Sequence, residues 1–402
     1  MTDILVVSPY DTPIGPSTRS YDIATYLAAK YKVNFLCSNF CHFTRSYIDI
    51  SSFSKSNLKL HVCLVTPYKT QLGRYISSIV YLVQIIFHIL FRKPSLVITP
   101  SVPLYLSFFI VIACKFTSAS TIFEIRDIWP LSLSQLSNLS TKSFLYRILD
   151  CMEKFIYTHC THIVSSLSHA HLHVASCIPP NLLPPITFIP NPISQKLLDY
   201  SLQKSVPNKS QSSDFNQIVY IGGFGIVHDV HTLLHASSYY LQHFDPTAQF
   251  HFYGNGEKKQ EIINLSHSFP SSEGIIFHDF IPKSEALKVA CQADVLIAAI
   301  PNRSIFDYGI NLNKIYLYLC AGKPIAFAGN IPYDFISEYL LGKTSPAEDH
   351  ILLAESIHSL IVDPIPRQCL LNSGQNYINL NLSPSIICDR YLNIVDSVLE
   401  KK

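Results

Sequence analysis

Short apolar runs alternate with amphipathic stretches along this chain, and polar or glycine-containing loops mark most of the switches. The first apolar runs of strand length are Ile4–Ser8 and Val33–Cys37, with a helical stretch at about 20–30 between them. Strand, loop, helix and strand in this order are typical of a parallel, doubly wound sheet. Five more strands are predicted before residue 190, at Lys59–Val65, Leu96–Thr99, Thr121–Glu124, His162–Ser165 and Thr187–Ile189.

The same order begins again after residue 216. A strand at Gln217–Ile221 leads into the loop Gly222–Gly225, a helix at Asp229–Tyr240 and a second strand at Ala248–Tyr253. Clustered prolines and a polar stretch separate the two halves. We therefore predict an α/β protein of two Rossmann-like, doubly wound parallel-sheet domains, with an N-terminal domain at 1–195, a linker at 196–216 and a C-terminal domain at 217–383.

The two halves carry opposite charge. Residues 1–200 have sixteen Lys and Arg against nine Asp and Glu, whereas residues 201–402 have fourteen against nineteen. The excess is concentrated between Lys30 and Lys115, where ten basic residues accompany a single acid, Asp49. A basic stretch of this kind indicates an anionic partner, and residues 30–115 are predicted to meet an anionic membrane surface.

The basic stretch contains two apolar runs without charge, Tyr75–Phe91 and Pro94–Cys114. Pro100 and Pro103 divide the second run into a strand-like and a helix-like part. The pattern favours core elements of a large α/β domain, with an apolar helix at a membrane face as the alternative. Both can hold for different faces of one helix. A full span is the least favoured reading, because the first run is at the short limit for crossing a bilayer.

Composition excludes several classes. The 402 residues are 48% apolar and 14% charged, so intrinsic disorder is excluded, and a net charge of +2 argues against a nucleic-acid binder. Eleven cysteines without a C-x-x-C pair favour reduced thiols. The first residues lack a basic leader with a cleavage site, so no signal peptide is expected and a cytoplasmic location is predicted.

Glycine is scarce and clustered. Of thirteen glycines, five follow predicted strand ends, at 222, 223, 225, 254 and 256. Parallel sheets bind ligands at the carboxyl ends of their strands, where glycine lets backbone N–H groups approach phosphate oxygens. These positions are therefore candidates for a phosphate or nucleotide-sugar site, with ordinary turns as the alternative.

Several motifs resemble those of retaining glycosyltransferases of family 4, in particular the bacterial branch that builds O-antigen and colanic-acid sugars. They are the loop 10–19, Phe123–Pro130, Ile189–Pro192, Tyr220–Gly225, Tyr253–Gly256, Phe280–Lys283, Phe306–Lys314 and Ala321–Pro324. The resemblance implies the GT-B fold, with two domains facing across a cleft and the helix at about 384–402 packed back on the N-terminal domain. It also implies a metal-independent reaction, a UDP-sugar donor without other cofactors and a lipid-linked saccharide acceptor.

The resemblance assigns residues to the donor. The C-terminal domain is expected to bind it, with help from two residues of the N-terminal domain, and a cation is expected to neutralise its phosphates. The expected donor-binding residues are Gly15, Arg19, Gly222, Gly223, Phe224, Gly225, Tyr253, Gly254, Asn255, Gly256, Phe280, Ile281, Tyr308, Gly309, Ile310, Asn311, Asn313 and Leu317. Lys314, Arg126 and Asp127 are the candidate catalytic residues.

Some positions depart from the family pattern. Two glutamates of the family fall at Gly309 and Leu317, and a carboxylate at the second position would bind the donor ribose. The family's loop arginine and lysine fall at Gly223 and His228. Lys314 is the nearby cation that remains, so it is expected to neutralise the diphosphate.

Alternatives remain for two residues of the N-terminal half and for the function. Asp127 either orients the sugar or acceptor hydroxyl or caps a helix. Arg19 either reaches a phosphate or lies on the surface. The function is predicted to be glycosyl transfer in lipopolysaccharide or other surface-polysaccharide synthesis, at the inner face of the cytoplasmic membrane. A nucleotide-sugar epimerase of the same fold and a degenerate, non-catalytic subunit are the alternatives. The histidines lack convergent ligand spacing, so no metal site is predicted.

Overall fold

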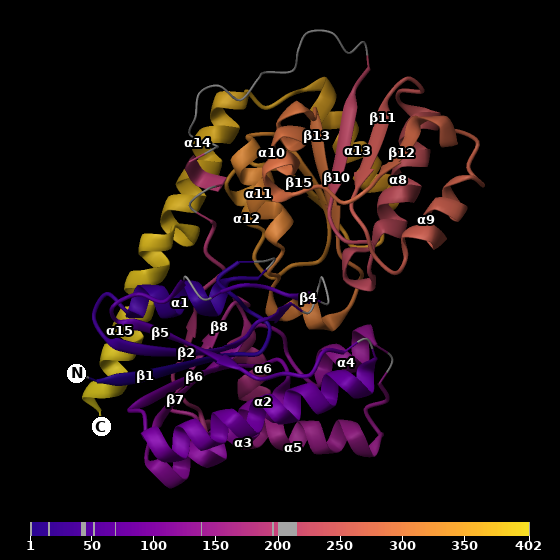
Figure 1. Cartoon of the computed structure of the whole chain (residues 1–402). Helices are drawn as coiled ribbons and strands as arrows, with labels where there is room; N and C mark the ends of the chain where they lie inside the picture. The colour runs from indigo at the N-terminus through magenta and orange to yellow at the C-terminus, as the bar shows by residue number, and fades with distance from the viewer. Residues whose placement is uncertain are drawn as a thin grey trace. The chain divides into compact units, whose positions relative to one another are not determined.

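The computed structural model describes residues 2–14, 17–41, 46–50, 53–68, 70–137, 139–194, 197–199 and 215–401. The chain divides into two compact units (Figure 1). Unit 1 comprises Met1–Pro192 and Ser385–Lys402, and unit 2 comprises Ile193–Pro384. The domain limits predicted from the sequence were 195, 217 and 383. Most of the predicted linker and Gly15 lie outside the described residues.

Unit 1 is built on a seven-stranded sheet in the order β5-β2-β1-β6-β7-β8-β9, and every pairing is parallel. Its strands are β1 (Asp3–Ser8), β2 (Lys32–Ser38), β5 (Leu58–Cys63), β6 (Leu96–Pro100), β7 (Ser120–Ile125), β8 (His162–Ser165) and β9 (Ile186–Phe188). A short antiparallel pair, β3 (Phe40–Cys41) and β4 (Ser46–Tyr47), stands apart from it.

Helices cover both faces of this sheet. They are α1 (Arg19–Leu27), α2 (Gln71–Arg92), α3 (Leu104–Thr117), α4 (Leu131–Leu136), α5 (Phe144–His159), α6 (Ala170–Cys177) and α15 (Pro384–Glu400). The period of two along β1 separates two cores: Ile4 and Val6 pack towards α1 and α15, whereas Leu5 and Val7 pack towards α2 and α3. Helices α2, α3 and α5 lie side by side on one face (Figure 1).

Unit 2 contains a six-stranded parallel sheet in the order β12-β11-β10-β13-β14-β15. The strands are β10 (Gln217–Ile221), β11 (Gln249–Tyr253), β12 (Ile275–His278), β13 (Val295–Ala299), β14 (Ile325–Ala328) and β15 (Gly342–Ser345). The helices are α8 (Val230–His243), α9 (Lys259–Ser266), α10 (Lys283–Gln292), α11 (Asn313–Ala321), α12 (Phe335–Glu338), α13 (His350–Val362) and α14 (Arg367–Tyr377). Two parallel-sheet α/β domains are thus confirmed.

The C-terminal helix belongs to unit 1 although unit 2 precedes it in the chain. Ile387, Tyr391 and Val395 of α15 are fully buried in the core that also contains α1 and β1. The Tyr391 hydroxyl donates a hydrogen bond to Glu124 of β7 (2.6 Å). The last helix therefore completes the first domain.

The two apolar runs form regular elements. Tyr75–Phe91 lies within α2, and the second run forms β6 and α3. By length and composition, α2 is the one helix among the described residues that could cross a membrane. Its inner face nevertheless belongs to the domain core, since Tyr81, Ile85 and Ile89 are buried there.

Candidate functional site

Two glycine-containing loops meet at the carboxyl edge of the unit 2 sheet. Gly222–Gly225 follows β10, and Gly254–Gly256 follows its neighbour β11. The Gly222 N–H donates a hydrogen bond to the Tyr253 carbonyl (3.0 Å), which joins the two loops. This edge is where parallel sheets bind their ligands.

Close packing explains two of these glycines. A Cβ on Gly254 would lie 1.8 Å from the carbonyl oxygen of Gly222, and one on Gly256 would lie 2.5 Å from that of Phe224. Gly254 also has a φ of +141°, which side chains rarely adopt. The packing of the loops therefore requires glycine at both positions, whether or not a ligand binds. The side chains that could contact a ligand lie around Gly222 and Gly223.

Lys314 places a cation beside the first loop. From the first turn of α11, its Nζ donates a hydrogen bond to the Tyr220 hydroxyl (2.9 Å) and lies 4.2 Å from the centre of that ring. A Cβ on Gly222 would lie 2.6 Å from Nζ, so the amine lies directly against the loop. Among the described residues, no carboxylate is within ion-pair distance of this amine, and burial lowers the pKa of Lys314 to about 7.

His228 lies against the same loop but supplies no second charge. Its Cδ2 lies 3.2 Å from the position that a Cβ on Gly223 would take. Burial, and secondly the charge of Lys314, lowers the pKa of His228 to about 3. The imidazole is therefore neutral at pH 7, so Lys314 is the one of these two side chains that supplies a charge.

Leu317 is part of the packed interior of α11. Its side chain is 7% exposed. The next residue, Tyr318, fixes the end of β10, because its hydroxyl accepts a hydrogen bond from the Ile221 N–H (2.9 Å) and donates one to the Ile297 carbonyl (3.1 Å). An apolar side chain thus occupies the position where the family pattern has a glutamate.

The other expected donor residues lie in three separate segments of unit 2. Tyr253 and Asn255 lie beside the Gly222 loop, since the Phe224 N–H donates a hydrogen bond to the Asn255 carbonyl (3.0 Å). Phe280, which is largely exposed, and Ile281 follow β12. The segment that precedes or opens α11 contains Tyr308, Gly309, Ile310, Asn311 and Asn313.

A cavity of about 500 Å³ lies further along the same sheet edge. Residues at or after the ends of β14 and β15, including Gly329, Asp334 and Ser345, line it together with Asp307. Asp307 is next to Tyr308 in the sequence, so the predicted segment extends to this cavity.

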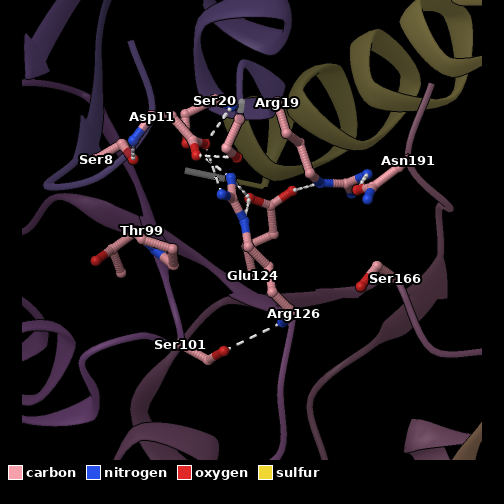
Figure 2. Close-up of polar contacts among 12 residues, drawn as sticks. Ser8, Asp11, Arg19, Ser20, Thr99, Ser101, Glu124, Arg126, Ser166 and Asn191 are labelled. Carbon is pink, nitrogen blue, oxygen red and sulfur yellow. Dashed lines mark hydrogen bonds and ion pairs between the residues drawn. The ribbon is translucent and has the colours of Figure 1, made fainter. Parts of the chain in front are cut away.

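In unit 1, two of the predicted site residues, Arg19 and Arg126, belong to a buried ion network (Figure 2). The Arg19 Nε donates to Glu124 Oε1 (2.7 Å), and its other nitrogens donate to the carbonyls of Ile189 and Pro190 and to the Asn191 side chain. The side chain is 5% exposed, so the surface alternative for Arg19 is wrong. Arg19 fastens α1 to β7 and to the segment after β9.

Arg126 is paired with two carboxylates in the same network. Its guanidinium contacts Asp11 Oδ2 (2.5 Å) and Glu124 Oε2 (2.6 Å), and it donates to the Ser20 hydroxyl (2.7 Å). Burial raises the pKa of both carboxyl groups, but the arginine charges and the hydrogen bonds to the carboxylates together outweigh burial and lower the pKa of Asp11 and of Glu124 to about 2. Both acids are ionised at neutral pH and balance the two arginines.

Asp127 lies outside this network. Its Oδ2 accepts a hydrogen bond from the Trp129 indole (3.2 Å), and burial raises its pKa. The N-cap of the following helix α4 is Pro130, so Asp127 does not cap it as the alternative reading expected. Its role at a sugar or acceptor hydroxyl remains a prediction.

The sequence reading missed the carboxylates of this network, Asp11 and Glu124, and its partners Asn191 and Tyr391. Glu124 offered one local signal, because it is the single charged residue of strand β7 and has apolar residues on both sides. Its partners are 105 residues away at Arg19 and 267 residues away at Tyr391, so no spacing rule could find them.

One group among the described residues has metal-ligand chemistry. Glu153, His173 and Cys177 hold their ligand atoms within 4.8 Å of one another. The His173 Nε2 lies 2.8 Å from Glu153, and hydrogen bonds to Cys177 and Glu153 outweigh burial and raise the pKa of His173 to about 9. The protonated imidazole and the carboxylate form a buried ion pair, and a metal ion would have to displace the His173 proton to bind here.

Two parallel-sheet α/β units in one chain are the architecture of the GT-B fold, and solved glycosyltransferases of that fold superpose on this chain. Sucrose-phosphate synthase from Thermosynechococcus elongatus superposes with a TM-score of 0.73 at 14% identity, over 100% of both chains. Anabaena HepE, in a complex with UDP-glucose, gives 0.65 at 12% identity over 99% of this chain and 100% of its own. WaaG, a glycosyltransferase involved in lipopolysaccharide biosynthesis, gives 0.63 at 12% identity over 96% of this chain and 99% of its own.

These likenesses show the fold, since the identities are all low. Neither a family model nor a curated protein sequence matches the chain. The O-antigen and colanic-acid branch therefore remains a prediction, and the activity has to be argued from the site.

Proposed function

We propose that this protein is a glycosyltransferase that takes its sugar from a nucleotide-sugar donor bound to unit 2. The observation that carries the proposal is Lys314, a partly buried amine that lies against the Gly222 loop without a carboxylate partner among the described residues. Neighbours of the same fold include a complex with UDP-glucose, which supports a UDP-sugar as the donor.

The reaction needs a group that stabilises the departing diphosphate. The bond between the sugar carbon and the phosphate oxygen breaks, and a bond to an acceptor hydroxyl oxygen forms on the same face of the sugar. The departing phosphate oxygen takes the proton of that hydroxyl, so no strong protein base is required. Protonated Lys314 and the backbone N–H groups of Gly223 and Gly225 offset the developing charge without a metal ion.

The proposal gives the unit 1 residues different tasks. Arg19 and Arg126 are positioning residues, because their guanidinium groups are bound to Glu124 and Asp11. Asp127 is the group proposed to orient the donor sugar or the acceptor hydroxyl. Its raised pKa favours a carboxyl group that exchanges a hydrogen bond with a hydroxyl.

We propose a lipid-linked saccharide as the acceptor, in the synthesis of lipopolysaccharide or another surface polysaccharide. The enzyme would work peripherally at the cytoplasmic face of the membrane. The basic stretch 30–115 supports this location, because the cytoplasmic leaflet is anionic.

Calorimetry with a panel of UDP-, GDP-, ADP- and dTDP-sugars tests the donor site. We expect one donor to bind and the Lys314→Ala variant to lose both that binding and transfer to a lipid-linked acceptor. Exposed Lys288 on α10 provides the matched control as Lys288→Ala. Unchanged transfer by Lys314→Ala would refute the assignment of Lys314.

A degenerate, non-catalytic subunit is the second candidate, and Leu317 is the observation that favours it. An apolar side chain there offers no carboxylate to a donor ribose. This candidate predicts no heat of binding with any donor of the panel, so the same titration separates the two functions.

A further inference from the structure

Helix α2 has two apolar faces, and only one of them belongs to the protein core. On the inner face, Tyr81, Ile85 and Ile89 are fully buried, and the Tyr81 hydroxyl donates a hydrogen bond to the Leu36 carbonyl (2.6 Å). On the outer face, nine apolar side chains are between 36% and 78% exposed: Leu72, Tyr75, Ile76, Ile79, Val80, Val83, Phe87, Leu90 and Phe91. They run the whole length of the helix.

Helix α2 has apolar side chains on its exposed face, which is the opposite of the usual arrangement for a helix in contact with water. At 100° per residue, the nine outer side chains fall within an arc of about 160°. The polar residues lie elsewhere: Ser77 and Ser78 are buried, and Gln84 bonds the backbone N–H and carbonyl of Leu64 (2.9 and 2.8 Å). A surface helix normally turns its polar side outwards, so the outer face of α2 is suited to an apolar environment.

The apolar face extends beyond α2 and ends in basic residues. Leu64 beside Gln84 and Phe116 near the end of α3 are 77% and 80% exposed. Exposed Arg92, Lys93 and Lys115 stand at the C-terminal ends of α2 and α3. The sequence has no Asp or Glu between residues 50 and 123. An apolar stripe with exposed basic residues at one end is complementary to an anionic lipid surface.

Spanning the membrane is incompatible with this packing. The inner face of α2 is part of the core formed with β1, β2, β6 and α3, so the helix cannot leave the domain to enter a bilayer on all sides. With 22 residues and a rise of about 1.5 Å each, it presents about 33 Å of apolar surface along its axis. A helix fixed on one side and apolar on the other fits the plane of the lipid interface.

We propose that the outer face of α2 docks unit 1 onto an anionic lipid bilayer, with the helix lying in the interface plane. The exposed apolar side chains enter the acyl region, and Arg92, Lys93 and Lys115 contact the headgroups. The inference rests on the peripheral membrane location proposed above and assigns the surface that makes the contact. It is tested separately from sugar transfer, because binding to lipid requires neither donor nor acceptor.

Sedimentation with vesicles of phosphatidylcholine, with and without phosphatidylglycerol, tests this proposal on the full chain. The test variant carries Ile79→Gln, Val83→Gln and Phe87→Gln. The matched control carries Ile351→Gln, Leu352→Gln and Val362→Gln on α13 of unit 2, where three side chains are likewise 41% to 66% exposed. We expect the wild type and the control to bind the anionic vesicles, and the test variant to bind about tenfold more weakly.

A second variant guards against misfolding. Arg92→Gln with Lys115→Gln leaves the apolar face intact, and we expect it to lower binding to anionic vesicles by about tenfold and to reduce the salt dependence. Thermal unfolding checks that each variant is folded. A carbonate wash is expected to release the wild type from the vesicles.

Three results would overturn the proposal. The first is a wild type that does not bind anionic vesicles, and the second is a folded test variant that binds as well as the wild type. In the first case, a wild-type dimer that the test variant converts to a monomer, measured by light scattering, would assign the face to a second copy of this chain. The third is resistance to carbonate, which would indicate a span.

Discussion

Unit 1 and unit 2 bury cationic side chains in opposite ways. In unit 1, Arg19 and Arg126 are balanced by Asp11 and Glu124 within hydrogen-bond distance. In unit 2, Lys314 is partly buried, with a tyrosine hydroxyl and a glycine loop as neighbours. The paired arginines connect α1, β7 and the segment after β9. Within the described part of the chain, the Lys314 amine has one hydrogen bond to a side chain, to the Tyr220 hydroxyl.

The difference shows that burial alone does not distinguish a cation that stabilises the fold from one that binds a ligand. A buried arginine at a sheet edge looks like a ligand-binding group. In unit 1, however, the guanidinium groups of both arginines already bind carboxylates of the same domain. The lowered pKa of Lys314, near 7, reports a charge that burial disfavours and that no carboxylate stabilises. An anion bound beside Lys314 would supply the balancing negative charge, which in unit 1 comes from Asp11 and Glu124.

The largest expected effect is the loss of the unit 1 network. Glu124→Gln removes one of two negative charges that balance two buried guanidinium groups, so we expect unit 1 to lose about 3–5 kcal/mol of stability. Trp129, the single tryptophan of the chain, lies in unit 1 and reports its unfolding by fluorescence in urea. The exposed Glu273→Gln in unit 2 is the control, and an unchanged midpoint for Glu124→Gln would contradict the network's structural role.

The next effect separates binding from stability at Lys314. Lys314→Met should weaken binding of the donor by about 30-fold, or about 2 kcal/mol, because one charge-assisted contact is lost. The same change should raise the melting temperature of unit 2 at pH 7. The folded pKa of about 7 lies below the ordinary value of 10.5, so the unfolded chain binds the proton more tightly, and burial of the amine destabilises the fold below pH 10.5.

Calorimetry for binding and circular dichroism for melting measure the two effects separately. Lys288→Met, on the exposed side of α10, should change neither. If Lys314→Met binds the donor normally, or if its melting temperature without ligand is lower than that of the wild type, Lys314 has a structural role like that of the arginines of unit 1.

A smaller effect is the pH dependence of donor binding. Above pH 7 the free protein loses the Lys314 proton that a diphosphate needs, so the dissociation constant should rise about tenfold between about pH 7 and 8.5. His228 stays neutral across this range, since its pKa is about 3. Titration in two buffers of different ionisation enthalpy should show proton uptake on binding. Lys314→Met should abolish both the proton uptake and the pH dependence of the dissociation constant. A wild-type dissociation constant that does not change with pH would contradict the assignment.

The smallest effect is expected at an ion pair on the surface of unit 1. Lys30 and Asp396 approach to 2.6 Å, but the lysine side chain is 54% exposed. Water and salt screen such pairs, so Lys30→Gln should leave the urea midpoint of unit 1 unchanged within error. A loss comparable to that of Glu124→Gln would mean that burial is not what separates the two kinds of pair.

Local patterns predicted the fold well, because strands and helices are encoded over short distances. Most expected strands lie within a few residues of the observed ones, and β8 and β10 match at both ends. The glycine loops were located for the same reason. The ion network was not foreseen, since its members come from residues 11, 19, 124, 126, 191 and 391 and meet only after the sheet has formed. Pairing between distant residues also decided which arginines were available to a ligand.

The placement of α15 has a consequence for synthesis on the ribosome. Residues 385–402 are made after all of unit 2, yet they fill the core beside β1 and hydrogen-bond Glu124. Unit 2 can therefore complete its core while unit 1 still lacks its last helix. A nascent chain stopped before residue 385 would expose the apolar groove that receives Ile387, Tyr391 and Val395, and would present it to chaperones and proteases.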